Sequence, residues 1–467
     1  MNAFDLIIIG GGAGAFAAGI KANELKKKTL IVNGGLPAGG TCVNVGCVPS
    51  KILVHAGEVL HNARNHGVPG IDIEVKNFDF KKVMEHELGM VEHFRDEKYH
   101  KVLKNLEHVT FMEGKAAFSS EKEIAVDGES YTAEKFIIAT GSTANVPPIE
   151  GISDAGYVTH IEALKLTEQP KEMLVIGAGP VGLELAQVYA RFGTKVTMLQ
   201  RGGRIFPHGE PDLIAGLHKV LEGEGITIHT KAEAKSVEVK DGKKVVTFSV
   251  DGSEQTITVD EILLASGKTP NTDELNLEAI GVDVNERKAV AVNEQFETNV
   301  PHVYAVGDVT SLPMRLETTA GHEGTLVTEN IFTDAKHTLN YDEVPYAIFT
   351  DPGYASVGLT EDAQMERDGV CACRTVPFEV IPKAGITGRT EGMIKMGIDP
   401  KTKVIVGVHI LAPNAADLIA QAMVLIKNKN TIEDVLNYEP VFPTLSEAIK
   451  YVALSFEKDV SQLSCCI

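Results

Sequence analysis

The chain contains two copies of one local pattern, in which an apolar strand runs into a glycine-rich turn and then into a helix. The first copy is Asp5-Leu-Ile-Ile-Ile followed by Gly10-Gly-Gly12-Ala-Gly-Ala15, and the second is Met173-Leu-Val-Ile followed by Gly177-Ala-Gly179-Pro-Val-Gly182. Uninterrupted apolar runs of this kind are typical of parallel strands covered on both faces. A single GxGxxG/A pattern is weak, since glycine turns often serve packing only, but each copy here has the strand before it and the helix after it. The repeat therefore predicts two α/β units.

Each unit predicts a dinucleotide site. The first glycine makes the turn, the second lets the backbone approach a pyrophosphate, and the helix N-terminus supplies N–H groups. The residue after the next strand contacts the ribose; in the first unit it is Asn33, whose amide oxygen can accept from a hydroxyl although a carboxylate is usual. In the second unit it is Gln200, followed by Arg201 and Arg204. Two guanidiniums and no carboxylate favour NADPH over NADH; the alternative is that both arginines are solvated loop charges.

The rest of the chain predicts how these units are connected. Phe136-Ile-Ile-Ala-Thr140-Gly141 and Glu261-Ile-Leu-Leu-Ala-Ser-Gly267 are matching strands, each after one unit, and are expected to be crossings between domains. Val303-Tyr-Ala-Val-Gly-Asp308 adds a strand that ends in an acid. The part after Tyr346 has no glycine-rich fingerprint, which favours a folding and dimerisation module. We predict an α/β protein with two Rossmann-like nucleotide-binding domains, at 1–150 with 268–340 and at 151–267, and a C-terminal α+β dimerisation domain at 341–467.

Charge and hydropathy exclude several partners. The net charge of −20 repels nucleic acid and anionic lipid surfaces. No apolar run reaches the roughly 18 residues of a membrane span. The most apolar stretch, residues 6–20, contains five glycines and lacks the basic flank of a signal peptide. We expect a cytoplasmic protein with no nucleic-acid partner and no membrane insertion.

The cysteines form three close pairs, which in a long intracellular chain favours redox or metal chemistry over a disulfide framework. The pairs are Cys42 with Cys47, Cys371 with Cys373, and Cys465 with Cys466. Five steps of regular helix from Cys42 to Cys47 rise ~7.5 Å, beyond the ~6.8 Å that a disulfide bridges. Gly46 must therefore relax the turn if these two are to pair. Cys371 and Cys373 are two apart, which places both on one face of a strand, and we expect structural thiols there.

Cys42 and Cys47 follow the first nucleotide unit, so they are expected beside a redox ring. A disulfide in that place can accept an electron pair, and a helix terminus and a nearby lysine stabilise the thiolate that results. Lys51 is the candidate for that charge, with Glu184 as its partner. A static structural disulfide is the alternative, which the glutathione pool of a cytoplasm opposes.

Taken together, GGTCVNVGCVPSK, the doubled GxGxxG/A, the Ala-Thr-Gly and Ala-Val-Gly-Asp segments and Phe349-Thr-Asp-Pro resemble the flavin disulfide reductases, the flavin-dependent pyridine nucleotide-disulfide oxidoreductase family. The resemblance covers essentially the whole chain. It implies a homodimer with FAD, NAD(P)H and interface domains in this order, in which each active site receives the partner's C-terminal segment. It also implies that Cys47 is the flavin-side thiol and Cys42 the exchanging one. The expected cofactor-binding residues are Gly10, Gly12, Ala15, Asn33, Thr41, Thr140, Gly141, Asp308, Gly177, Gly179, Gly182, Gln200, Arg201, Arg204 and Gly267.

The substrate side separates the members of that family. Lipoamide dehydrogenases and glutathione reductases carry His-Pro near the C-terminus, with the His as acid/base, whereas here Phe442 precedes the proline. An apolar ring cannot shuttle a proton. The chain ends in Cys465-Cys466-Ile467, which resembles the vicinal pair of mercuric reductases, members that reduce Hg(II) to Hg(0). Soft thiolates select such a cation.

Tyrosines give a further point of comparison with the mercuric reductases. Tyr99 matches a tyrosine that those enzymes place beside the inner metal site; an ordinary half-exposed helix residue is the alternative. Their second tyrosine falls at Phe442, and Tyr438 is the residue that could replace it.

The resemblance thus implies an FAD- and NADPH-dependent mercuric reductase acting on Hg(II)–thiol complexes. The expected catalytic residues are Cys42, Cys47, Tyr99, Cys465, Cys466, Lys51 and Glu184, and the four cysteines among them are the expected Hg(II) ligands. Two alternatives stay open. One is a disulfide reductase that uses the C-terminal pair as an electron relay, and the other is a non-catalytic thiol protein that sequesters metal.

Overall fold

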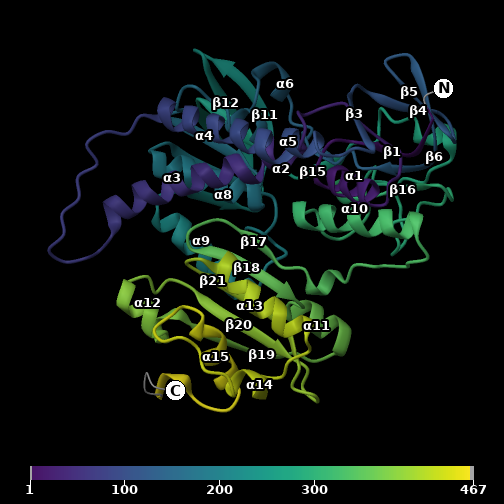
Figure 1. The fold of residues 1–467 in the computed structure, drawn as a ribbon. Helices are drawn as coiled ribbons and strands as arrows, with labels where there is room; N and C mark the ends of the chain where they lie inside the picture. The colour runs from purple at the N-terminus through teal and green to yellow at the C-terminus, as the bar shows by residue number, and fades with distance from the viewer. Residues whose placement is uncertain (1–2, 463–467) are drawn as a thin grey trace.

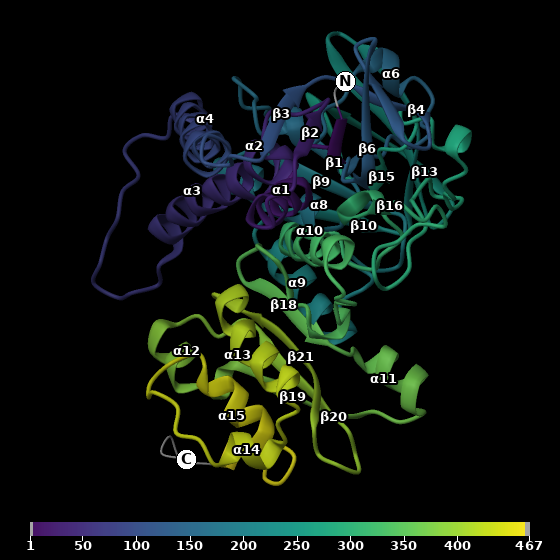
Figure 2. The same cartoon turned by 45° about the vertical axis from the view of Figure 1, so that its right-hand side comes forward.

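The structure, a computed structural model, describes residues 3–462. Two α/β lobes lie side by side, and the C-terminal part of the chain forms a third lobe beneath them (Figure 1). Figure 2, turned by 45°, shows the same separation between the C-terminal lobe and the other two. This arrangement confirms the predicted fold class of two nucleotide-binding α/β units followed by an α+β domain.

The first lobe is built on the first strand–turn–helix unit, β1 (Ala3–Ile9), α1 (Ala13–Glu24) and β2 (Thr29–Asn33). Its sheet has the order β3-β2-β1-β6-β5-β4, with β16 paired to β6. The remaining strands are β3 (Val109–Glu113), β4 (Ala116–Ser120), β5 (Glu123–Val126), β6 (Glu129–Ile138) and β16 (Val303–Ala305). Helix α10 (Glu317–Phe332) packs on α1 so closely that a Cβ on Gly324 would lie 2.2 Å from the carbonyl oxygen of Gly14. Small residues thus fix the position of the turn after β1.

Between β2 and β3 the chain forms a helical excursion that carries the first cysteine pair. It comprises α2 (Gly40–Val45), α3 (Cys47–Asn65), α4 (Phe80–Arg95), the π-helical turn η1 (Asp96–His100) and α5 (Lys101–Leu103). Apolar side chains of α3 and α4, including Leu53, Phe80 and Met84, pack against Tyr189 and Phe192 of the second lobe. This shared core holds the cysteine-bearing helices against the second nucleotide unit.

The second lobe contains the second unit, β8 (Glu172–Ile176), α8 (Pro180–Phe192) and β9 (Lys195–Gln200), in a parallel sheet of order β10-β9-β8-β14. The other strands are β10 (Thr227–Thr230) and β14 (Glu261–Leu264), with α9 (Pro211–Gly223) between β9 and β10. An antiparallel sheet is inserted, made of β11 (Ala232–Lys240), β12 (Lys243–Val250) and β13 (Ser253–Val259). The two expected crossings lie side by side, because β7 (Ser142–Ala144) pairs antiparallel with β15 (Lys268–Pro270).

The third lobe is an antiparallel sheet of order β17-β18-β21-β20-β19. Its strands are β17 (Tyr346–Ile348), β18 (Gly353–Gly358), β19 (Ala372–Pro377), β20 (Met393–Ile398) and β21 (Ile405–Ala412). Its helices are α11 (Glu361–Asp368), α12 (Pro382–Thr387), α13 (Ala415–Lys427), α14 (Ile432–Leu436) and α15 (Glu447–Leu454). Helix α13 packs on β18 and β21, and α15 packs on β19 and β20.

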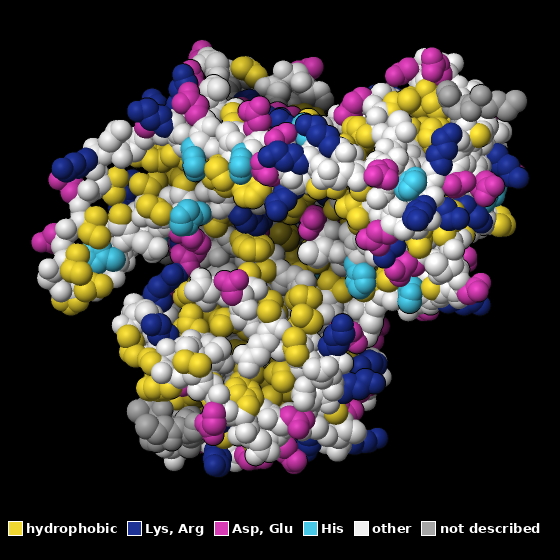
Figure 3. Space-filling view, viewed as in Figure 1, with side chains coloured by type: hydrophobic (Ala, Val, Ile, Leu, Met, Phe, Trp, Pro, Cys, Tyr) yellow, Lys and Arg dark blue, Asp and Glu magenta, His cyan; other side chains and the backbone are white. Residues whose placement is uncertain are grey.

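The surface is mixed in charge. Figure 3 shows acidic and basic side chains interspersed over one face, and a recess lined largely by apolar side chains where the upper lobes meet the C-terminal lobe. None of the helices within residues 3–462 combines the length and the apolar character needed to cross a bilayer.

One buried carboxyl group makes the stability of this fold depend on pH. Glu87 on α4 is 1% exposed, and within residues 3–462 its Oε2 has no hydrogen-bond partner. Burial raises its pKa to about 7 from the ordinary 4.5. Between these two values the native state holds a proton that the unfolded chain has released. The free energy of unfolding therefore falls as the pH rises through this window.

We predict that Glu87→Gln, which carries no charge at any pH, removes this dependence. Its free energy of unfolding should exceed that of the parent at about pH 8 and match it closely at about pH 5. Urea denaturation at both pH values measures the difference. Glu85→Gln, at an exposed position on the same helix, is the control and should leave the pH dependence as it is. A parent-like pH dependence in Glu87→Gln would contradict the prediction.

Candidate active site

Two adjoining cavities open at the carboxyl ends of the strands of the first sheet. One, of about 620 Å³, is lined by the turn after β1, the end of β2 and both crossing segments. The other, of about 580 Å³, is lined by Cys42, Cys47, Lys51 and Glu184 and by the start of α10. The residues common to both are Gly12, Thr41, Ala139, Gly141, Ser142, His160 and Lys268. Both volumes are typical of cofactor and ligand sites.

The backbone around the first glycine turn fits a dinucleotide. Gly10 has φ +128°, and a Cβ there would lie 2.2 Å from the carbonyl oxygen of Ala139. Gly12 and Gly40 touch, because a Cβ on Gly40 would lie 2.7 Å from the Cα of Gly12. Helix α1 begins directly after Gly12. The turn therefore presents bare backbone and a helix N-terminus, the arrangement that binds a pyrophosphate.

Asn33 packs against the same glycine turn, next to Gly11. It ends β2, is 4% exposed, and its Nδ2 donates to Leu36 O and to Glu113 Oε2, both at 2.9 Å. Its Oδ1 faces Gly11, where a Cβ would lie only 2.3 Å away. The amide oxygen is thus fixed beside the turn, and its bond to a ribose hydroxyl stays a prediction.

The other residues expected around the first cofactor differ in their placement. Thr41, Thr140 and Gly141 line the first cavity. Asp308 lines the second, and its Oδ2 accepts from Ser142 Oγ at 2.7 Å. Ala15, which is fully buried within α1, and Gly267, which precedes β15 with φ +107°, line neither of these two cavities.

The second glycine turn has the same close packing. Gly177 has φ +109°, and a Cβ there would lie 2.4 Å from the carbonyl oxygen of Ala265. A Cβ on Gly182 would lie 2.1 Å from the carbonyl oxygen of Gly177, and Gly179 immediately precedes α8. A larger residue could occupy neither Gly177 nor Gly182 without moving backbone. This turn also fits a dinucleotide.

The polar residues after β9 lie around that turn. Gln200 Oε1 accepts from the backbone N–H of Ala178 at 3.2 Å, so its amide is held against the glycine loop. Arg201 is exposed, and Arg204 Nη2 donates to Pro207 O at 2.6 Å. Neither arginine lines the two cavities. Their binding of a 2′-phosphate stays a prediction.

The first cysteine pair lies where two helices meet. Helix α2 ends at Val45, Gly46 leaves the helical conformation with φ −135° and ψ −113°, and α3 begins at Cys47. A Cβ on Gly46 would lie 2.9 Å from the carbonyl oxygen of Thr41. The turn expected from the spacing is therefore present, and it places the Cys47 sulfur at a helix N-terminus.

Both of these cysteines are thiols in the structure, the reduced form of the pair. The hydrogen bond between the two side chains lowers the pKa of Cys47 and raises that of Cys42. The charge of Lys51 lowers the pKa of Cys47 further. The N-terminus of α3 acts in the same direction. Cys47 is therefore the ionised thiol, and Cys42 stays protonated and donates a hydrogen bond to the Cys47 sulfur.

Lys51 and Glu184 form the ion pair expected from the sequence. Lys51 Nζ lies 2.7 Å from Glu184 Oε2, and the carboxylate is nearly buried. The other carboxylate oxygen of Glu184 accepts from the backbone N–H of Phe349 at 2.9 Å, and Lys51 Nζ also lies 4.4 Å from the centre of the Phe349 ring. The lysine is thus fixed one helical turn from Cys47; its role in catalysis stays a prediction.

Tyr99 lies beside the cysteine pair. It belongs to η1, and its ring packs edge-on against Phe16 with centroids 4.8 Å apart. Burial raises its pKa to about 12, and the charges of Cys42 and Glu317 add to this effect. The hydroxyl therefore keeps its proton at neutral pH and can donate to an anion near Cys42.

Three residues of this site were missed by the sequence analysis. Glu317, the first residue of α10, lines the second cavity, and its charge raises the pKa of both thiols and of Tyr99. His160 and Lys268 line both cavities, with Nε2 and Nζ 3.0 Å apart. Burial, helped by the charge of Lys268, lowers the pKa of His160 to about 4, so the imidazole is neutral. Lys268 could have been found from the sequence, because it directly follows the predicted Gly267. No sequence signal linked Glu317 or His160 to the thiols.

The C-terminal segment expected at a partner's active site is described up to residue 462, and its described residues belong to the third lobe. Val441 and Phe442 are 75% and 52% exposed in the single chain. Tyr438, the suggested replacement for a second tyrosine, is half-buried, and its hydroxyl accepts from Gln421 Nε2 at 3.0 Å. Cys465 and Cys466 lie outside the described residues.

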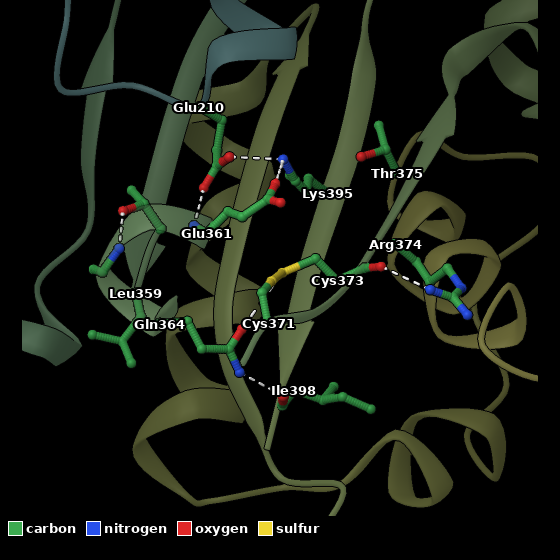
Figure 4. Close-up of a disulfide and its surroundings, with 12 residues drawn as sticks. Glu210, Leu359, Glu361, Gln364, Cys371, Cys373, Arg374, Thr375, Lys395 and Ile398 are labelled. Atoms are coloured by element: carbon green, nitrogen blue, oxygen red, sulfur yellow. Dashed lines mark hydrogen bonds and ion pairs between the residues drawn. A yellow bond between two sulfur atoms is a disulfide. The ribbon is translucent and has the colours of Figure 1, made fainter. Parts of the chain in front are cut away.

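The expectation of structural thiols at Cys371 and Cys373 is wrong. The two are joined by a disulfide with a Cα–Cα distance of 5.7 Å (Figure 4). The predicted geometry explains the bond, because extended backbone directs side chains two residues apart to one face, within bridging distance.

Comparison with known proteins agrees with this architecture. The pyridine nucleotide-disulphide oxidoreductase family model matches residues 4–324, and the dimerisation domain of the same family matches residues 344–453. Mercuric reductase of Streptomyces lividans is 37% identical, covering 99% of this chain and 98% of its own length. Dihydrolipoyl dehydrogenase of Thermus scotoductus is 38% identical, covering 98% of each chain.

A solved structure extends the comparison to three dimensions. The HOCl-induced flavoprotein disulfide reductase RclA from Escherichia coli matches with a TM-score of 0.85 and 26% identity, over 97% of this chain and all of that one. Because the two family models together span both glycine-turn units, the dithiol and the C-terminal sheet, the chain belongs to the pyridine nucleotide-disulphide oxidoreductase family.

Proposed function

We propose that the protein is a homodimeric, NADPH-dependent mercuric reductase that reduces Hg(II) to Hg(0). Membership of the family implies FAD and a nicotinamide dinucleotide as cofactors. Sequence identity does not choose the substrate, since a mercuric reductase and a dihydrolipoyl dehydrogenase match almost equally. The choice rests on the side chains around the dithiol and on the C-terminal segment.

The observation that carries the proposal is Phe442. At this exposed position, directly before Pro443, lipoamide dehydrogenases and glutathione reductases carry an acid/base histidine, and a phenyl ring supplies no such group. Reduction of a metal ion needs no proton at that point. It needs soft ligands, which Cys42 and Cys47 provide inside the second cavity.

The chain's own residues then have separable roles. Bound FAD, once reduced by hydride from NADPH, would supply the electron pair. Cys47, held as the thiolate by Lys51 and the α3 N-terminus, and Cys42 bind Hg(II) as a bis-thiolate. The protonated hydroxyl of Tyr99 donates a hydrogen bond to an anion near Cys42. The C-terminal cysteine pair collects Hg(II) from small thiols and passes it inward by ligand exchange. The neutral atom leaves because loss of charge weakens its bonds to thiolate.

We predict that Cys42→Ala or Cys47→Ala abolishes mercury reduction and leaves FAD bound, because the inner site then has one thiol instead of two. In Cys47→Ala the long-wavelength thiolate-to-flavin absorbance should also disappear on anaerobic reduction with NADPH. Flavin absorbance and volatile mercury are the measurements. If Cys47→Ala kept that band, the roles of the two thiols would be reversed.

We predict a preference for NADPH over NADH, because Gln200 brings no carboxylate and Arg201 and Arg204 can bind a 2′-phosphate. Each charge-assisted contact is worth ~1–3 kcal/mol, so Arg201→Ala and Arg204→Ala should each lower kcat/KM for NADPH roughly 5- to 150-fold and spare NADH. Arg287→Ala, in an exposed loop elsewhere, is the control. Equal kcat/KM values for the two dinucleotides in the parent would contradict this assignment.

We predict that replacing both Cys465 and Cys466 by Ala cripples turnover of Hg(II) in excess glutathione and spares turnover of weakly ligated HgBr₂, which enters the inner site without a relay. A disulfide reductase would instead lose protein-disulfide reduction and show little mercury phenotype. A merely metal-sequestering protein would release no volatile mercury in either assay.

The same pair can be tested for action across the dimer. Mixing a Cys42→Ala chain with a Cys465→Ala, Cys466→Ala chain should restore activity, because a mixed dimer then contains one complete site. Absence of activity after verified subunit exchange would show that the tail serves its own subunit.

A further inference from the structure

The disulfide between Cys371 and Cys373 lies on the C-terminal lobe, and neither cysteine lines the cavities described above. It stands at the start of β19, which is the edge strand of its sheet. Both cysteines are partly exposed. The pair therefore lies at the surface of the lobe and not in its core.

The two cysteines differ in how firmly the sheet holds them. Cys373 is within β19 and is paired with Gly397 of β20, whereas Cys371 precedes Ala372, the first paired residue of the strand. Gly397 lies beside both side chains, since a Cβ there would make an ordinary van der Waals contact with Cys373 Sγ at 3.6 Å and a tight contact with Gln364 Oε1 at 3.2 Å. Cys373 is thus fixed by backbone pairing in the sheet. Cys371 lies just outside the paired strand, so its backbone is free to change conformation when the disulfide opens.

Gln364 on α11 points its amide oxygen at this pair (Figure 4). Its side chain is 1% exposed, its Nε2 donates to Ile398 O at 2.7 Å, and its Oε1 lies 3.4 Å from Cys373 Sγ. A disulfide sulfur has no hydrogen to donate. Within residues 3–462 no other donor to this oxygen is present, so the buried acceptor gains a partner only when Cys373 is a thiol.

The surrounding charge favours a cation. Lys395, two residues before Gly397 and on the same face of β20, is held by Glu210, Asp212 and Glu361. Three carboxylates around one ammonium make this cluster net negative, and the guanidinium nearest the pair, that of Arg374, is engaged with the carbonyl oxygen of Cys373 at 3.0 Å. Figure 4 shows Glu210, Glu361 and Lys395 beside the disulfide. An anionic ligand is disfavoured there, and a cation is attracted.

We propose that Cys371 and Cys373 form a redox-gated binding site for a soft, thiophilic cation, closed as the disulfide and open as the dithiol. Gln364 acts as a positioning residue that favours the open form. The inference does not depend on which substrate the flavin site reduces, because it rests on a different lobe and on different cysteines.

Opening and binding are balanced reactions with small thiols. A thiolate of glutathione attacks one sulfur and breaks the Cys371–Cys373 bond, and a second glutathione resolves the mixed disulfide, leaving two protein thiols and oxidised glutathione. Hg(II) carried by two glutathione molecules then exchanges ligands. Two protein S–Hg bonds form, two glutathione S–Hg bonds break, and the protons of the protein thiols pass to the released glutathione. Mercury keeps its oxidation state.

Binding is tested on full-length protein in which Cys42, Cys47, Cys465 and Cys466 are all replaced by Ser, so that only this pair remains. Flavin absorbance verifies that the variant is folded. After reduction and anaerobic desalting it should bind about one Hg(II) per chain, seen as near-ultraviolet thiolate-to-mercury absorbance and loss of both free thiols. The oxidised form, and the reduced form with Cys371→Ser and Cys373→Ser added, should bind none.

The parent protein provides a second measurement in case that variant fails to fold. After reduction, HgCl₂ should protect the peptide containing Cys371 and Cys373 from alkylation, as measured by mass spectrometry. A pair that stays oxidised at every glutathione ratio in the folded protein, or a reduced pair that HgCl₂ does not protect, would overturn the proposal.

Gln364 is tested through the redox equilibrium of the pair. Gln364→Leu removes the acceptor for the Cys373 thiol, so the ratio of disulfide to dithiol in a glutathione buffer should rise roughly 2- to 10-fold. Glu366→Leu introduces the same side chain at an exposed position of α11 and should leave the ratio unchanged. An equal shift in both variants, or none in Gln364→Leu, would remove Gln364 from the proposal.

Discussion

The ion pair between Lys51 and Glu184 joins all three lobes at one point. Lys51 belongs to α3 of the first lobe and Glu184 to α8 of the second, and the carboxylate also accepts from the backbone of Phe349, which follows β17 of the third. Glu184 is almost fully buried, so removing the lysine would leave a buried carboxylate without its counter-charge; because the Lys51 side chain is 33% exposed, the cost is smaller than for a fully buried pair. The relative positions of the glycine turns, the dithiol and the C-terminal lobe therefore depend on this contact.

The same lysine adds to the hydrogen bond between the thiols in favouring ionisation of Cys47 over Cys42. The hydrogen bond from Cys42, the charge of Lys51 and the N-terminus of α3 favour ionisation of Cys47, whereas burial and the charge of Glu317 oppose it. Cys42 has the hydrogen bond, burial and Glu317 all acting against ionisation. The asymmetry of the pair thus also arises from geometry, because the helix break at Gly46 places Cys47, and not Cys42, at the N-terminus of α3.

Local patterns predicted most of the fold, and long-range contacts account for what they missed. The strands, both glycine turns and the break at Gly46 follow from residue order, because each is decided within a few positions. Asn33 and Gln200 were predicted for the same reason. Glu317 and His160 were not, since each reaches the site from an element distant in sequence and nothing local marks its target. The bond between Cys371 and Cys373 was missed although their spacing was noted, because disulfides were expected to be disfavoured in an intracellular chain.

The two cysteine pairs show how one side chain serves different chemistry in different surroundings. Cys42 and Cys47 lie beside a lysine and a helix terminus, which stabilise a thiolate and so favour electron transfer and ligand exchange. Cys371 and Cys373 lie beside a neutral amide oxygen and a cluster in which three carboxylates engage Lys395, while Arg374 is engaged with the Cys373 carbonyl oxygen. That environment favours the neutral dithiol, which gives up its protons only when a cation replaces them. The pair on the edge strand is therefore suited to exchange its protons for a soft cation, and the pair at the helix junction is suited to the thiol–disulfide redox chemistry of its family.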